Sequence, residues 1–230
     1  MQKRAPEPAQ QALALPARGG KRPGAGRPSS RERSAVPHVE RDDVRPYQPV
    51  HVTLRMADAV WNLRSERSFA VIHAALTAAR RRPDARVVHF SVQGNHIHLI
   101  VEASGTAALS NAVRALAIML ARRLNRMMGR SGPVFEGRFH SHVLRTPAEV
   151  RNALRYVVGN FASHAARRNE PMRQGWVDPF SSAAGKTPRS AQVAMFPEPP
   201  VRPAKTWLLR QGDRPRTAAL PSSGNEGHVV

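Results

Sequence analysis

Proline is distributed unevenly along the 230-residue chain, and this distribution limits which part of the chain can build a packed domain. Residues 1–46 hold seven prolines and residues 181–230 hold seven more, whereas the 134 residues between them hold six. Proline removes a backbone donor and interrupts helices and strands, so proline-rich stretches pack poorly into regular structure. The sequence therefore predicts one folded domain over 47–180, between a disordered basic arm at 1–46 and a disordered tail at 181–230.

The charge of the chain is strongly positive. It carries 36 Lys+Arg against 16 Asp+Glu, a net charge of +20, of which +11 falls within 47–180. Only four of the basic residues are lysines. Because the planar guanidinium group of arginine binds phosphate through two parallel hydrogen bonds, an arginine surplus favours a polyanionic partner. We therefore expect the folded domain to bind a nucleic acid.

Several classes of protein are excluded by what the sequence lacks. It has no cysteine, so a disulfide scaffold, a Cys-type zinc finger, an iron–sulfur site and a thiol nucleophile are ruled out. Its longest apolar stretches are interrupted or far shorter than the ~20 residues of a membrane span. The first residues show no sustained apolar core of a secretory signal. We expect a soluble cytoplasmic protein, of bacterial type and associated with the nucleoid, that makes no membrane contact.

Hydrophobic periodicity within 47–180 predicts strands and helices in the order β-α-β-β-α-β-α. Strands are expected at 50–56, 86–92, 96–103 and 134–144, and helices after the capping residue Ser65, at 107–128 and at 147–166. The last helix begins with a capping box, Thr146-Pro147-Ala148-Glu149. This order of elements indicates an α+β fold, in which helices pack on an antiparallel sheet.

Two pairs of histidines have the spacing of residues that share one face of a strand. His96 and His98 flank Ile97, and side chains two residues apart on a strand lie close enough to share one ion. Taken alone, such a pair is more often two solvated or hydrogen-bonded histidines. His140 and His142 have the same spacing and are a direct rival, although a serine stands between them instead of an apolar anchor.

The last predicted helix places two polar residues away from its apolar stripe. At 100° per residue, Tyr156 and Asn160 share one face. The apolar stripe comprises Val150, Leu154, Val157, Val158 and Phe161. A tyrosine is ordinarily a core or interface residue, and an asparagine on a helix surface is ordinarily solvated. The alternative interpretation is that Tyr156 is a nucleophile and Asn160 an oxygen ligand beside the two histidines.

Arginines gather on and just after the helix predicted at 107–128, and they are candidates for tracking a phosphate backbone. Charged runs are also commonly solvated helix faces, but few acidic neighbours are present here to neutralise them. The predicted DNA-binding set is Arg114, Arg122, Arg123, Arg126, Arg130 and, in a later segment, Arg138.

In combination, these segments resemble a known family, the REP-associated tyrosine transposases of the single-tyrosine HUH group. Residues 95–99 (NHIHL) resemble the histidine–hydrophobic–histidine strand of that group, and residues 132–139 (GPVFEGRF) and 156–160 (YVVGN) resemble its later motifs. The resemblance extends over roughly 47–181 and includes residues 178–182 (DPFSS).

The resemblance implies a ferredoxin-like α+β domain that cleaves and rejoins single-stranded DNA near hairpins. Carried over position by position, His96, His98 and Asn160 would be the ligands of Mg²⁺ or Mn²⁺. Tyr156 would attack the scissile phosphodiester to form a 5′-phosphotyrosine link and release a 3′-hydroxyl. Whether two copies of the chain form a homodimer is left open.

One residue departs from the family pattern. The family commonly has proline after the asparagine, whereas this chain has Phe161. Without a proline the helix can continue, which changes how far Tyr156 can swing. A second function therefore stays open: a hairpin-DNA-binding protein, retained by its host, that has lost cleavage.

Overall fold

The computed structural model describes residues 42–184, except 47, 61 and 171, and residues 199–212. These residues belong to one compact unit of the chain, His38–Val230. Most of the predicted disordered arm at 1–46, together with 185–198 and 213–230 of the predicted tail, lies outside the described residues.

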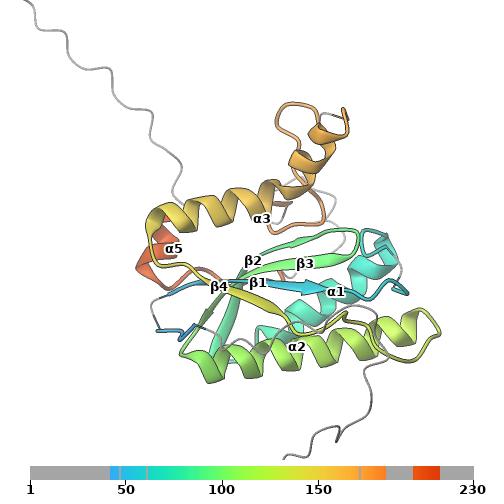
Figure 1. The fold of residues 1–230 in the computed structure, drawn as a ribbon, viewed down its shortest axis with the longest axis horizontal. Coiled ribbons are helices and arrows are strands. Elements are labelled where there is room, and N and C mark those ends of the chain that lie inside the picture. Colours follow the sequence, from blue (N-terminus) through green and yellow to red (C-terminus); the bar gives the residue numbers. More distant parts are fainter. Residues whose placement is uncertain (1–41, 47, 61, 171, 185–198, 213–230) are drawn as a thin grey trace, which may run out of the picture. The chain divides into compact units, whose positions relative to one another are not determined.

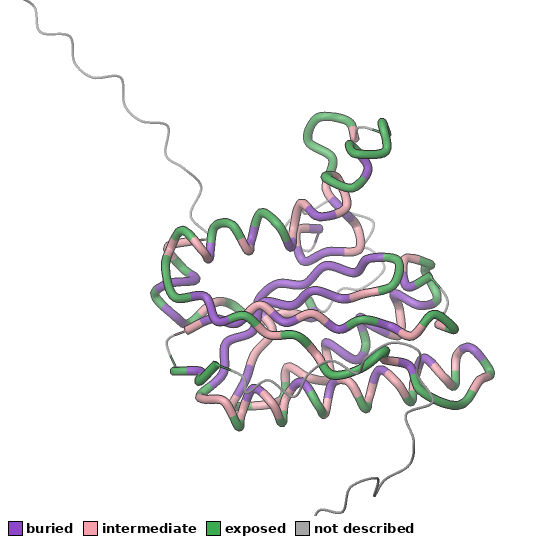
Figure 2. The backbone as a smooth tube through the Cα atoms, in the orientation of Figure 1, coloured by how far each residue is buried: buried purple, intermediate pink, exposed green. Residues whose placement is uncertain are grey.

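The centre of the fold is a four-stranded antiparallel sheet in the order β2-β3-β1-β4. The strands are β1 (Val50–Arg55), β2 (Ala85–Val92), β3 (His96–Ala103) and β4 (His140–Val143). This strand order and the helices around it confirm the predicted ferredoxin-like α+β class. Figure 2 shows that β2 and β3 are buried along most of their length, whereas the edge strand β4 is largely exposed.

The fourth strand is shorter than the predicted 134–144. Gly132 has a φ of 96° and is followed by Pro133, which has no N–H to donate to a ladder. Residues 134–139 therefore form a loop, which is joined to the sheet edge by an isolated bridge between Met56 and Phe135. Regular pairing with β1 begins only at His140.

Helices α1 (Glu66–Ala79) and α2 (Thr106–Met127) cover one face of the sheet (Figure 1). The side chain of Ser65 caps α1 by accepting the N–H of Ser68, as expected. The apolar stripe of α2 is buried against the sheet and α1; it comprises Leu109, Val113, Leu116, Leu120 and Leu124. Within the described part of the chain, no helix has both the length and the apolar character needed to span a bilayer.

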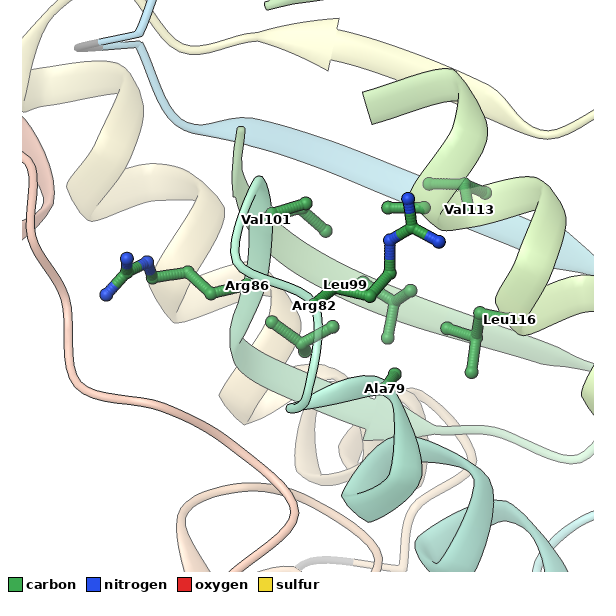
Figure 3. Close-up of a pocket in the computed structure, with 10 residues that line it drawn as sticks. Ala79, Arg82, Arg86, Leu99, Val101, Val113 and Leu116 are labelled. Carbon is green, nitrogen blue, oxygen red and sulfur yellow. The ribbon is translucent and has the colours of Figure 1, made fainter. Parts of the chain in front are cut away.

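A small pocket lies in this layer, between the end of α1, the strands β2 and β3, and α2 (Figure 3). Its walls are mostly alanine, valine and leucine side chains, with the stems of Arg82 and Arg86 at its rim. The two guanidinium groups point away from each other in Figure 3. A volume of about 20 Å³ is close to the space that one water needs, so this pocket is a packing gap and no substrate site.

The opposite face of the sheet is covered by α3 (Pro147–Arg167) and the short helix α5 (Trp207–Gly212). The predicted capping box starts α3, since the side chain of Thr146 accepts the N–H of Glu149. A second apolar cluster forms between α3, α5 and the sheet; it comprises Val88, Ile100, Leu144, Val150, Leu154, Val157, Leu208 and Leu209.

Helix α5 corrects part of the prediction that 181–230 is a disordered tail. Leu208 and Leu209 are buried in the second cluster, and the buried carboxylate of Glu102 accepts the backbone N–H groups of Lys205 and Thr206. Apolar burial and a helix-capping carboxylate therefore order 199–212 in spite of its proline content.

Candidate active site

The two histidines of the 96–98 motif lie on the face of the sheet that α3 covers. Alternation along β3 directs Ile97 into the cluster under α1 and α2, and it directs His96 and His98 to the other side. Their ring centroids are 4.7 Å apart. In the ladder between β3 and β1, His98 pairs with Thr53 and His96 with Arg55.

Both ring nitrogens of His98 face polar atoms, and only 3% of this residue is exposed. Its Nδ1 lies 3.1 Å from Nε2 of His51 and 3.1 Å from Oγ1 of Thr53, both on β1. Its Nε2 lies 3.5 Å from Nδ2 of Asn160 on α3. Nδ1 of His96 is 2.8 Å from Oδ1 of the preceding Asn95. In both histidines, a neighbouring side chain on the sheet or its turn thus contacts Nδ1.

Helix α3 brings Tyr156 and Asn160 to these histidines. The ring of Tyr156 makes edge contacts, with centroids 5.1 Å from His98 and 5.8 Å from His51. Half of Tyr156 is exposed, so its ring borders both the histidines and solvent. Asn160 is only 2% exposed and faces His98, so the interpretation of this asparagine as a solvated surface residue does not hold.

The electrostatic environment keeps these imidazoles neutral at physiological pH. Burial, followed by the charges of His96, His51 and His164, lowers the pKa of His98 from 6.5 to about 3. Burial and His142 lower the pKa of His51 to about 4. Burial also lowers the pKa of His96, with smaller contributions from His164 and Arg55. A neutral imidazole retains the lone pair that a metal ion requires.

The residues present fit a divalent cation. Oδ1 of Asn160 is buried and has no hydrogen-bond partner among the residues that the structure describes. An unsatisfied buried oxygen, on a residue whose amide faces His98, is a suitable third ligand for such an ion. The same part of the chain holds no group of three or more His, Cys, Asp or Glu side chains placed to bind a metal.

The rival pair, His140 and His142, lies on the edge strand β4. Both residues are exposed, and the Nε2 atom of His142 is 3.9 Å from Oε2 of Glu149. In the ladder they stand opposite Thr53 and His51, on the same face as the other histidines. Asn160 and Tyr156, however, are in contact with His98.

Three further residues on this face of the sheet belong to none of the sequence motifs: His51, Thr53 and His164. His51 and Thr53 reach His98 only through the register between β1 and β3. His164 extends the spacing of Tyr156 and Asn160 by another turn, and its charge acts on His96 and His98. The spacing of four residues on α3 is the one signal in the sequence that could have pointed to His164.

The arginines of α2 lie on the other side of the sheet from the histidines. Arg114, Arg122 and Arg126 are exposed there, and Arg123 is partly so. Arg130 also stabilises the loop after α2, because its guanidinium group donates to Oδ1 of Asn125 and to the carbonyl of Pro133. The last member of the predicted set, Arg138, is exposed in the loop before β4.

Phe161, where the family commonly has proline, lies inside α3, so the helix continues to Arg167 as expected. The guanidinium carbon of Arg64 is 3.6 Å from the centroid of its ring. Arg64 in turn forms a bidentate ion pair with the buried Asp178 and donates to the carbonyl of Val92. Phe161 therefore connects the middle of α3, next to Asn160, to the hairpin that carries His96.

Comparison with known proteins identifies the fold. No protein-family model matches the chain, and no curated protein is significantly similar to it. Among solved structures, it is similar to a REP-associated tyrosine transposase bound to a REP hairpin, with 16% identity, a TM-score of 0.50, and coverage of 74% of this chain and 93% of that one. A candidate transposase from Deinococcus radiodurans R1 matches at 14% identity and a TM-score of 0.37, over 54% of this chain and 92% of that one. The chain therefore has the fold of a REP-associated tyrosine transposase, as its three motifs predict.

Proposed function

We propose that this protein is a DNA transposase that cleaves and rejoins single-stranded, hairpin-forming DNA through a 5′-phosphotyrosine intermediate. The observation that carries the proposal is the meeting of four side chains on one face of the sheet: His96, His98, Tyr156 and Asn160. The fold supports it, since the structural neighbour described as a REP-associated tyrosine transposase is bound to a REP hairpin. We place the activity in the cytoplasm, on nucleoid DNA.

In the proposed reaction the hydroxyl oxygen of Tyr156 attacks the scissile phosphorus. A Tyr–O–P bond forms to the phosphate that remains on the 5′ end of the downstream strand, and the P–O3′ bond to the upstream strand breaks. The phenolic proton passes to solvent, which half-exposed Tyr156 can reach, and the departing 3′-oxygen takes up a proton to become a free hydroxyl. Attack by a 3′-hydroxyl on the phosphotyrosine reverses these changes, so a strand is rejoined without ATP.

The ligands of the proposed ion are His96, His98 and the orphaned oxygen of Asn160. A bound Mg²⁺ or Mn²⁺ would polarise a phosphate oxygen and stabilise the charge that develops during the reaction. Two imidazole ligands favour Mn²⁺ over the harder Mg²⁺ as an experimental probe. The neutral state of both rings leaves their lone pairs available at physiological pH.

We assign the DNA contacts away from the cut to the arginines of the predicted set: Arg114, Arg122, Arg123, Arg126, Arg130 and Arg138. Because α2 lies on the other side of the sheet from Tyr156, its arginines are suited to phosphates distant from the scissile one. Such contacts make affinity depend steeply on salt. Homodimer formation is not required for the four side chains to meet, since one chain supplies them all.

The experiment that tests the proposal follows the covalent intermediate. Labelled hairpin oligonucleotides with single-stranded flanks are incubated with the full chain and Mn²⁺, then separated under denaturing conditions. We expect a protein–DNA adduct that is lost in Tyr156→Phe. The chain has only two tyrosines, so Tyr47→Phe is the matched control and should retain the adduct.

The histidine variants separate the two candidate pairs. The double variant His96→Ala, His98→Ala should lose the adduct while retaining salt-sensitive hairpin binding, whereas His140→Ala should retain both. Hairpin binding without an adduct in the wild-type protein, with either Mg²⁺ or Mn²⁺, would overturn the enzymatic proposal and favour the binding protein that has lost cleavage. Loss of metal dependence in the His140 variant alone would transfer the site to β4.

A further inference from the structure

We propose that His51 is a positioning residue, which holds the imidazole of His98 in the tautomer that carries its proton on Nδ1. In this tautomer Nε2 offers its lone pair to the ion. The inference rests on the proposed function, because it concerns the same metal site. It assigns a role to a residue of β1 that has no place in the 95–99, 132–139 or 156–160 motifs.

The contacts of His98 show which ring nitrogen is available. Nδ1 is enclosed by β1, with Nε2 of His51 and Oγ1 of Thr53 each 3.1 Å away. Nε2 faces α3, where Nδ2 of Asn160 lies 3.5 Å from it. With the Asn160 amide in this orientation, Nδ2 can only donate, so Nε2 of His98 accepts. A neutral imidazole has one proton, and in His98 this proton must therefore lie on Nδ1.

The hydrogen bond to His51 then has a defined direction. Nδ1–H of His98 donates, and Nε2 of His51 accepts, so that His51 carries its own proton on Nδ1. The hydroxyl of Thr53 is less selective, because it can either donate or accept. Thr53 is therefore compatible with both tautomers of His98, and His51 is the neighbour that distinguishes them.

The second proposed ligand, His96, carries its proton on the same ring nitrogen, but the neighbour that fixes it there is an asparagine. Nδ1 of His96 lies 2.8 Å from the side-chain oxygen of Asn95, which can only accept. His96 must also carry its proton on Nδ1 and leave Nε2 free. Both imidazoles thus offer the same nitrogen. Substituting a partner that fixes the tautomer of a ligating histidine typically lowers metal affinity by about 10- to 100-fold.

Removing His51 should relax this selection. In His51→Phe an aromatic ring is retained but the acceptor is lost, and the Thr53 hydroxyl becomes free to donate to Nδ1 of His98. The tautomer with the proton on Nε2 then gains population, and that proton occupies the position where the ion must bind. We expect Mn²⁺ affinity to fall by about 10-fold.

The test uses long-range ¹H–¹⁵N spectra of the ¹⁵N-labelled, metal-free full chain at pH 7.5, with His98 assigned by the signals lost in His98→Gln. Wild type, Thr53→Val and His140→Phe should show His98 protonated on Nδ1. His51→Phe, and His51→Leu as a second variant without the acceptor, should show a shift towards protonation on Nε2. Affinity for Mn²⁺ alone, measured by electron paramagnetic resonance, should fall only in the two His51 variants. Backbone spectra report whether each variant retains the fold.

Two results would overturn the inference in different ways. If Mn²⁺ fails to broaden the His98 signals of the wild-type protein, the proposed metal site is wrong and the inference fails with it. If Mn²⁺ does broaden them but the tautomer of His98 is unchanged in both His51 variants, or changes instead in Thr53→Val, then only the positioning role of His51 is excluded.

Discussion

The candidate site is built around one residue, Asn160, whose buried side-chain amide is poorly satisfied by hydrogen bonds. Asn160 is almost wholly enclosed within a helix, yet its Oδ1 finds no partner among the described residues. An unpaired buried acceptor commonly costs about 1–3 kcal/mol. A residue that only packs would be expected to be apolar here, so the retained amide supports the proposed role as a ligand.

Asn160→Leu separates this role from folding. Leucine has nearly the shape of asparagine and removes the unsatisfied oxygen, although Nε2 of His98 then loses its contact. These two effects oppose each other, so we expect the free energy of unfolding to change by no more than about 1 kcal/mol. Mn²⁺ affinity and the covalent DNA adduct should both be lost. Urea denaturation and the adduct assay measure the two properties. A much larger loss of stability, or Mn²⁺ affinity equal to that of the wild type, would contradict the prediction.

The sequence was informative about residues that belong to a spaced motif and silent about those placed by register. His96 and His98 could be predicted to share a strand face, and Tyr156 and Asn160 a helix face, because both periodicities are local. His51 and Thr53 reach His98 across a ladder whose pairing depends on the whole sheet. Their contacts with Nδ1 of His98 are therefore visible only in the folded chain.

At the scale of elements, the position of α3 over the sheet depends on contacts from Phe161. Its ring covers the guanidinium group of Arg64, and Arg64 is held by Asp178 and by the carbonyl of Val92 at the end of β2. A proline at this position would remove a backbone donor from the helix and could not make the same stack. In this chain, a cation–π contact takes the place of a helix break next to Asn160.

A double-mutant cycle tests the contact between Phe161 and Arg64. Phe161→Leu and Arg64→Lys should each destabilise the protein, and their combined effect should be smaller than the sum by about 1–2 kcal/mol, the usual strength of a desolvated cation–π pair. Urea denaturation gives the four free energies of unfolding. A control cycle of Trp207→Leu with Arg64→Lys should be close to additive, because Trp207 lies on the separate helix α5. Additivity in the first cycle would show that Phe161 stabilises α3 by apolar burial alone.

Helix α5 is the element that proline content concealed. The sequence placed it in the tail, since composition averages over a window and cannot weigh two buried leucines against several prolines.

Leu209→Ala should destabilise the protein by about 2–4 kcal/mol, because the side chain of Leu209 is fully buried against α3 and the sheet. Trp207→Ala is the matched control: Trp207 is 63% exposed, so its loss should change stability by no more than about 0.5 kcal/mol. Equal stability of the two variants would contradict the docked position of α5.

At the scale of the whole molecule, the two faces of the sheet have different chemistry. The face under α1 and α2 is a continuous apolar core with arginines on its outer helix. The face under α3 carries histidines from three strands and a helix: His51, His96, His98, His140, His142 and His164. This division arises because successive side chains of a strand point to opposite faces of the sheet, and apolar residues alternate with histidines at the start of β3. The proposed chemistry is thereby confined to one layer, and most of the large apolar core lies in the other.

The buried histidines on the face under α3 predict that the metal-free protein loses stability in mild acid. The folded pKa values of His98 and His51, about 3 and about 4, lie below the ordinary value of 6.5, so the unfolded chain takes up protons that the folded chain refuses. Stability should therefore be fully present above pH 6.5 and should decline as the pH falls towards these folded values. By pH 5, His98 alone should lower the free energy of unfolding by about 2 kcal/mol, because its folded pKa lies far below that pH.

Chemical denaturation in the presence of a chelator, at pH 7.5, 6 and 5, measures this loss. Keeping the pH at 5 or above avoids the range in which ordinary carboxylates titrate. His98→Gln removes the most strongly shifted group, so its stability should fall by about 2 kcal/mol less than that of the wild type over this interval. His140→Gln, which alters an exposed histidine, should follow the wild-type curve. If wild type and His98→Gln lost stability equally, His98 would titrate as it does in water, and the buried neutral imidazole on which metal binding depends would not exist in solution.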